Sequence, residues 1–347
     1  MRCRVLVVGS VLSMAIAVVS LSMIPVGAQT SPAATTAKKL TVPRTADGQP
    51  DLQGIWDYRT LTPMERPSDL AGKEVLTEEE AAAFEKKTLV ASDADRRDAD
   101  PSREGLVNGA PATADVARAY NQFWMDRGSK VVGTKRTSLI IDPPDGRIPP
   151  LTTEGKKRTA ALAAARERPA VGPEDRSVGE RCIMGFNAGP PMTPGGYNNN
   201  FLLLQVPGYV VILNEMVHST RIIPMDRRPH GDIRQWAGDS RGHWEGDTLV
   251  VDTTNFYAQT SLNGSSPNLH VVERFRRVDA DTLLYEFTVD DPTTWVRPWT
   301  AQVPMIRNPE PMYEYACHEG NYGMTNLLSA ARAVEKASDE AAKKGSR

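Results

Sequence analysis

Short runs of alternating apolar and polar residues recur between residues 199 and 320, and this two-residue period predicts β-strands. Turn signals such as Glu245-Gly-Asp247 and Asp279-Ala-Asp281 separate several runs. Because short links join antiparallel neighbours, the runs predict a meander. An open meander would leave unpaired edges, so we predict closure into a β-barrel over residues 199–320. The predicted strands are NNFLLLQ, YVVILNEMV, TRIIPMD, RGHWEG, DTLVVDTTNF, LHVVERFRRV, TLLYEFTVDD, WVRPWTAQVPM and MYEYACHEG.

Two regions of different character flank the predicted barrel. Residues 43–198 predict an irregular region of short helices that wraps the barrel, with helix starts at Thr77, Thr113 and Thr153. Within it, residues 169–200 are dense in Gly and Pro, which suits either a wall of a ligand site or a plain connector. Residues 321–347 predict a C-terminal helix and tail, because apolar positions recur at helical spacing at Leu327, Leu328, Ala331 and Val334.

The N-terminus has the pattern of a secretory signal peptide over residues 1–28. Arg2 and Arg4 precede an apolar run, and small residues end at Ala28. An uncleaved membrane anchor is the alternative, because the run is long enough to span a bilayer. Residues 29–42 are small and polar and predict a disordered leader. We therefore expect a protein of the periplasm or the extracellular medium, without a membrane association after cleavage.

Cleavage would remove Cys3 and leave Cys182 and Cys317. An even pair of cysteines in an oxidising compartment predicts a disulfide between them. Two separate buried thiols are the alternative.

Composition and motifs exclude several classes of function. The 347 residues include 41 Lys+Arg and 43 Asp+Glu, a formal net charge of −2, which argues against a nucleic-acid partner. The sequence has no P-loop, no GxGxxG after a strand, no GxSxG and no CxxC. Nucleotide binding, α/β-hydrolase chemistry and zinc-ribbon or thioredoxin sites are therefore unsupported.

Strand direction places three histidines at one end of the predicted barrel. Successive strands of a meander run in opposite directions, so every second turn lies at the same end. This places His218, His270 and His318 at one rim, provided that the loop at 227–239 crosses from one end to the other. An imidazole near a carboxylate suits acid/base catalysis, so the candidate catalytic residues are these three histidines with Glu215 and Glu319. A zinc site and a purely structural role remain alternatives. His230 and His243 are interpreted as structural.

Polar and aromatic residues near this rim are candidate ligand contacts. The PGGYNNN segment offers Tyr197, Asn198, Asn199 and Asn200, whose amides could donate to an oxyanion. Trp295 begins a strand at the same rim. Asp252, Arg274 and Glu286 would form a buried charged network if they face the barrel interior, and would simply face water if they do not.

Several segments together resemble a family of secreted bacterial proteins of unassigned function. They are PDLQGIWDYRTLTPMERP, RTSLIIDPPDGRIPPLT, PGGYNNN, GYVVILNEMVH, GDSRGHWEGDTLVVDTTNF, ERFRRVDADTLLYEFTVDDP and YEYACHEGNYG. GHWEGDTLVV is also similar to the strand pattern of calycin-type barrels, a resemblance that implies a barrel binding small hydrophobic ligands.

These observations lead to one function hypothesis with two alternatives. We expect an exported β-barrel that binds a small, partly aromatic organic molecule and transforms it by acid/base chemistry, as a lyase, isomerase or hydrolase. The first alternative is a non-catalytic periplasmic ligand-binding or interaction module. The second is a metal-dependent enzyme with a His-coordinated ion such as zinc; otherwise we expect no cofactor.

Overall fold

A computed structural model describes residues 42–92, 106–107, 110–111, 125–260, 262 and 264–345. The predicted signal peptide, almost all of the predicted leader and most of the helix predicted after Thr113 lie outside these residues. Among the helices that are described, none is long and apolar enough to cross a membrane.

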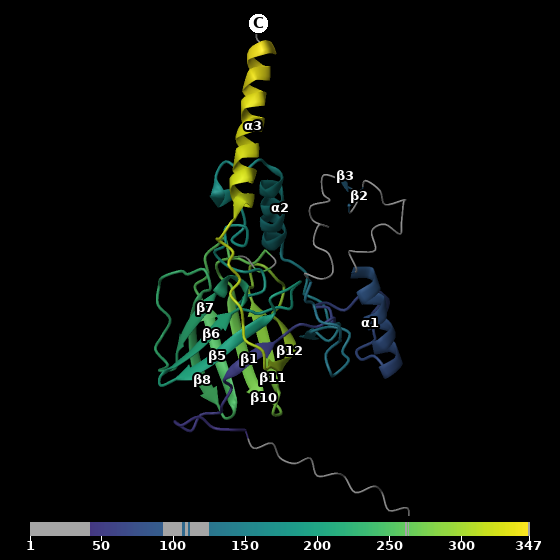
Figure 1. Ribbon diagram of the computed structural model, residues 1–347, viewed down its shortest axis with the longest axis vertical. Coiled ribbons are helices and arrows are strands. Elements are labelled where there is room, and N and C mark those ends of the chain that lie inside the picture. Colours follow the sequence, from purple (N-terminus) through teal and green to yellow (C-terminus); the bar gives the residue numbers. More distant parts are fainter. Residues whose placement is uncertain are drawn as a thin grey trace, which may run out of the picture. The chain divides into compact units, whose positions relative to one another are not determined.

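The dominant element is a ten-stranded antiparallel sheet, as the alternating pattern predicts (Figure 1). Its strands run in the order β7-β6-β5-β1-β12-β11-β10-β9-β8, and β4 pairs with β12 off this path. A separate two-stranded ribbon joins β2 (Leu106–Val107) and β3 (Ala110–Pro111). The strands of the large sheet are β1 (Gly54–Asp57), β4 (Ile140–Asp142), β5 (Asn200–Val206), β6 (Tyr209–Asn214), β7 (Thr220–Pro224), β8 (Asp239–Glu245), β9 (Thr248–Thr254), β10 (His270–Arg277), β11 (Thr282–Asp290) and β12 (Trp299–Asn308).

The sheet is not the simple meander predicted for residues 199–320. Strand β1 comes from the region expected to be irregular, and it lies between β5 and β12. The side chain of Trp56 on β1 is fully buried, so this short strand is stabilised in the sheet by the apolar area that Trp56 buries in the core. Conversely, the segment MYEYACHEG forms no strand. Pro309 and Pro311 precede it and cannot donate ladder hydrogen bonds, so the last strand ends at Asn308.

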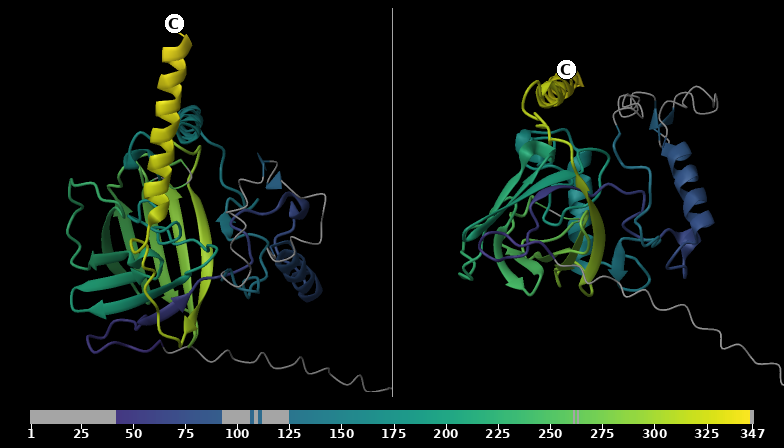
Figure 2. Two further views of the ribbon diagram at one scale, coloured as in Figure 1. Left: turned by 45° about the horizontal axis from the view of Figure 1, so that its top comes forward. Right: turned by 60° about the horizontal axis from the view of Figure 1, so that its bottom comes forward.

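The predicted closure into a barrel is not confirmed for this sheet. The sheet curls (Figure 2), but β7 and β8 are its two edges and no strand pairing joins them in the described chain. The edges nevertheless come close at Gly242 on β8. A Cβ atom there would lie 2.3 Å from Met225 Sδ and 3.0 Å from Ile223 Cγ2. Side chains rather than backbone hydrogen bonds therefore fill the gap between the two edge strands.

Three α-helices accompany the sheet: α1 (Glu78–Ser92), α2 (Thr153–Glu167) and α3 (Tyr322–Gly345). Thr77 and Glu80 form the predicted capping box of α1, with Glu80 N donating to Thr77 Oγ1 at 3.2 Å and Thr77 N donating to Glu80 Oε2 at 2.9 Å. The cap of α2 is Thr152, one residue earlier than predicted. Short 3-10 turns occur at η1 (Ser68–Leu70), η6 (Pro173–Asp175) and η7 (Met216–His218).

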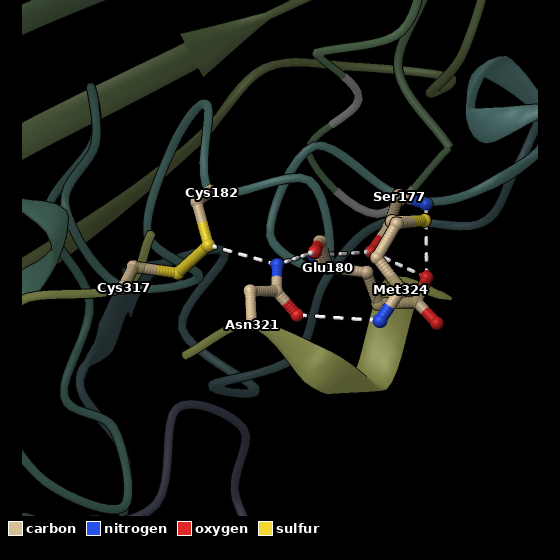
Figure 3. Close-up of a disulfide and its surroundings, with 6 residues drawn as sticks. All are labelled: Ser177, Glu180, Cys182, Cys317, Asn321 and Met324. Carbon is tan, nitrogen blue, oxygen red and sulfur yellow. Dashed lines mark hydrogen bonds between the residues drawn. A yellow bond between two sulfur atoms is a disulfide. The ribbon is translucent and has the colours of Figure 1, made fainter. Parts of the chain in front are cut away.

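The predicted disulfide between Cys182 and Cys317 is present, with a Cα–Cα distance of 5.6 Å. Figure 3 shows that it lies beside the start of α3. There Asn321 donates through Nδ2 to the carbonyl of Glu180 at 3.1 Å and to Cys182 Sγ at 3.3 Å, and its Oδ1 accepts from Met324 N. Further along α3, Arg332 donates to the carbonyls of Ala170 and Val171. The disulfide and this helix therefore fasten residues 170–182.

Candidate functional site

Two imidazoles flank one carboxylate on the outer face of the sheet. His270 Nε2 donates to Asp252 Oδ2 at 2.7 Å, and His230 Nε2 donates to Asp252 Oδ1 at 2.8 Å. Asp252 lies in the middle of β9, between the fully buried Val251 and Thr253, so strand alternation turns it outward. Asp252 pairs with Val272 of β10, which sets the ring of His270 diagonally across from the carboxylate.

His230 reaches this carboxylate from the loop between β7 and β8. The loop is held to the strand ends beside it: Gly231 N donates to Asp239 Oδ2 at 2.8 Å, and Asn255 Nδ2 donates to the carbonyl of Gly231 at 2.6 Å. Arg241 Nε also donates to the carbonyl of Pro229 at 3.2 Å. His230 is thus positioned by backbone contacts on both sides, and its contact with Asp252 is compatible with the structural role predicted for it.

The pKa shifts of Asp252 and His270 show that the contact favours the charged pair. Burial alone would raise the pKa of Asp252, but the hydrogen bonds and positive charge of His270 and His230 outweigh burial and hold that pKa below its usual value. The hydrogen bond that His270 donates to Asp252 raises the pKa of His270 against a smaller opposing effect of burial, and the carboxylate of Asp290 adds to the rise. His270 Nδ1 makes no hydrogen bond within the described residues, which leaves it available for proton transfer.

The other two histidines of the predicted rim do not join this pair. The strand directions do point the end of β6, before His218, and the start of β10, at His270, toward the same end of the sheet. His218 is half-exposed, with Nδ1 3.6 Å from Glu314 Oε1, and His318 is exposed. In the described chain no imidazole of these three bonds to another, and no group of three His, Cys, Asp or Glu side chains is arranged to hold a metal ion.

Among the glutamates and asparagines predicted near the rim, Glu215, Asn199 and Asn200 make hydrogen bonds within the fold. Asn200 Nδ2 donates to Glu215 Oε2 at 2.9 Å, whereas Glu319 is exposed. Asn199 is fully buried: its Oδ1 accepts from Gly195 N at 2.7 Å and its Nδ2 donates to the carbonyl of Asp126 at 2.8 Å. The carbonyl of Asn198 accepts from Asn187 Nδ2. The Asn199 amide thus has backbone partners and the Asn200 amide has side-chain partners, so the geometry of these two amides fits loop positioning.

The predicted charged network of Asp252, Arg274 and Glu286 does not face the interior. All three lie on the outer face of the sheet, where Arg274 Nη2 donates to Glu245 Oε2 at 2.6 Å and Gln302 Nε2 donates to Glu286 Oε2 at 3.1 Å. The alternative that these charges face water is therefore the one that the structure shows. Trp295 is 2% exposed and packs edge-on against Trp299, which places it in the core.

The interior instead holds an ion pair that was not predicted. Arg221 of β7 makes a bidentate contact with Glu273 of β10, whose side chains are 3% and 0% exposed. Tyr285 donates its hydroxyl to Glu273 Oε1 at 2.8 Å and accepts from Met192 N at 3.0 Å. The signal was available, because Glu273 falls in the apolar phase of its strand between Val271 and Phe275.

A cavity of about 450 Å³ lies at the same end of the sheet as His270. Residues of α2, of segment 174–193 and of the β9–β10 connection line it. Segment 169–200 thus supplies a wall, one of the two roles considered for it. Leu269 lines the cavity, but its neighbour His270 does not, because adjacent strand residues point to opposite faces.

Comparisons with family models, with curated proteins and with solved structures found no match. The two features of the structure that bear on function are the Asp252 pair and the cavity.

Proposed function

We propose that this protein is an exported acid/base catalyst acting on a small, partly aromatic organic molecule, with His270 as the proton-transfer residue. The hydrogen bond of 2.7 Å between His270 Nε2 and Asp252 Oδ2 carries the proposal. A carboxylate on one ring nitrogen fixes the tautomer and stabilises the imidazolium, so the other nitrogen can take up and return a proton. The disulfide supports export, because disulfides persist in oxidising compartments.

In the proposed chemistry, neutral His270 accepts a substrate proton at Nδ1 while its Nε2–H stays bonded to Asp252. The imidazolium then returns the proton to the product or to water. His230 shares the same carboxylate and positions it, since both carboxylate oxygens are occupied by imidazole donors. Lyase, isomerase and hydrolase reactions all use such a step.

The test uses 5-nitrobenzisoxazole, an aromatic probe whose ring opening to a coloured nitrophenolate requires only removal of a C–H proton by a base. The wild-type protein should open the ring with a pH profile that rises through a pKa above the usual value for histidine, as the raised pKa of His270 requires. His270→Gln should slow the reaction by about 10²-fold or more. Asp252→Asn should move the inflection to lower pH, because it removes the contact that raises the pKa.

His243→Gln is the matched control, since His243 is also a partly exposed strand histidine that contacts a carboxylate, Glu245. It should retain the wild-type rate. The proposal fails if the wild-type rate equals that of the His270→Gln variant, or if both histidine variants lose activity equally.

The non-catalytic alternative is favoured by a different observation, the cavity beside α2. A protein that binds a small molecule there without turnover would show ligand binding but no dependence of probe opening on His270.

A further inference from the structure

The cavity beside α2 has walls from three separate parts of the chain and a floor on the protein core. Phe256 and Leu269 of the floor are 0% and 2% exposed. Leu162 comes from α2, and Phe186 from the Gly- and Pro-rich segment that the disulfide fastens. Phe186 is 58% exposed and packs edge-on against Tyr197, with ring centroids 5.5 Å apart. A volume of about 450 Å³ with such walls suits a small aromatic molecule.

Two polar groups in the cavity wall have no partner. Arg176 Nε and Thr260 Oγ1 are buried and make no hydrogen bond within the described residues. A guanidinium Nε can only donate, and a hydroxyl can donate, so both groups favour a ligand that carries a hydrogen-bond acceptor. A buried donor without a partner is costly, and a ligand acceptor would remove that cost.

The two carboxylates of the cavity wall, Glu174 and Asp175, do not cancel this preference for a ligand with a hydrogen-bond acceptor. Asp175 accepts hydrogen bonds from the backbone amides of Val171 at 2.8 Å and Gly172 at 3.4 Å. These bonds, together with the charges of Arg168 and Arg176, lower the pKa of Asp175. Glu174 is exposed. In contrast, Arg166 and Arg176 make no ion pair with any described carboxylate within 4.0 Å.

We infer that this cavity binds an aromatic carboxylate or sulfonate, with the ring on the floor formed by Phe256 and Leu269 and the anionic group toward Arg176 and Thr260. The site is separate from His270, and the inference does not depend on the proposed catalysis.

The test compares two fluorescent probes that differ only in an anionic group, 8-anilinonaphthalene-1-sulfonate and the uncharged N-phenyl-1-naphthylamine. Both should bind the wild-type protein with one site per chain. Arg176→Met should weaken the sulfonate about tenfold and the uncharged probe less than about twofold, since hydrogen bonds to charged groups are worth about that factor. Arg168→Met removes a neighbouring arginine that does not line the cavity and should change neither affinity.

A second variant tests the location of the site. Ala165→Trp places an indole into the cavity from α2 and should weaken both probes at least tenfold, whereas Ala161→Trp, at an exposed position of the same helix, should not. Unchanged binding in Ala165→Trp would overturn the site, and equal losses of both probes in Arg176→Met would overturn the preference for an anion. His270→Gln should bind both probes normally, so failure of the catalytic proposal is seen separately.

Discussion

Replacing Glu273 by glutamine should destabilise the protein more than any single surface change, because it leaves a buried charge without its partner. Arg221 and Glu273 are 4% and 0% exposed, and they join β7 to β10 across the interior of the sheet. Burial alone would lower the pKa of Arg221, but Glu273 keeps it above its usual value, so the guanidinium is charged when folded. Removing one member of such a pair costs about 3–5 kcal/mol.

That loss is large against the roughly 5–15 kcal/mol that stabilises a typical domain. Urea unfolding followed by circular dichroism would measure it as a lower midpoint at unchanged slope. The double variant Glu273→Leu with Arg221→Met removes both charges and should lie within about 2 kcal/mol of the wild type. Two results would refute the reasoning: a Glu273→Gln variant within about 1 kcal/mol of the wild type, or a double variant as unstable as the single one.

Three further changes test other parts of the structure. Asn214 is fully buried, and neither polar atom of its side-chain amide has a partner among the described residues. Asn214→Leu should therefore raise the free energy of unfolding by about 1–2 kcal/mol, whereas a lower free energy of unfolding would show that the amide is hydrogen-bonded when folded. Gly242→Ala should cost about 1–3 kcal/mol because its Cβ would meet Met225, whereas Gly133→Ala, with open space, should stay within about 0.5 kcal/mol in the same unfolding assay. The lowered pKa of Asp252 stabilises the fold at pH values above about 4, and the raised pKa of His270 stabilises it below about 6.5. Asp252→Asn should therefore reduce the free energy of unfolding most between those pH values. A loss that does not depend on pH would contradict a charged Asp252–His270 pair.

Local pattern predicted most strands but not their order in the sheet. Segments such as DTLVVDTTNF and TLLYEFTVDD form β9 and β11 because alternation and tight turns are local properties. The pairing of β1 with β5 and β12 is not local, since it depends on which distant segment can bury Trp56. The aromatic alternation of MYEYACHEG suggested a strand, but nearby prolines end the ladder before it.

The candidate site was also predictable only where it depends on local sequence pattern. Strand direction placed His270 at the correct end of its strand, and alternation identified Asp252 as a polar residue on one face. The sequence could not show that His230 reaches Asp252, because its position depends on the contacts that hold Gly231 to Asp239 and Asn255. The role of His270 in catalysis remains a prediction.

The disulfide and the cavity are connected, because the disulfide holds the irregular segment that forms one wall of the cavity. Residues 174–193 line the cavity with little regular structure, so ordering them would oppose binding unless other contacts hold them in place. Cys182 lies within this segment, and its partner is Cys317. Asn321, just before α3, donates to the carbonyl of Glu180 in the same segment, and Arg332 of α3 donates to the carbonyl of Val171 just before it. Replacing both cysteines by alanine should therefore lower the free energy of unfolding by about 3–5 kcal/mol, as expected for a long closed loop, and also weaken the uncharged naphthylamine probe. The weakening should appear under conditions where far-ultraviolet circular dichroism shows an intact sheet. If the affinity is unchanged while stability falls, the wall is held by its own contacts and the disulfide serves stability alone.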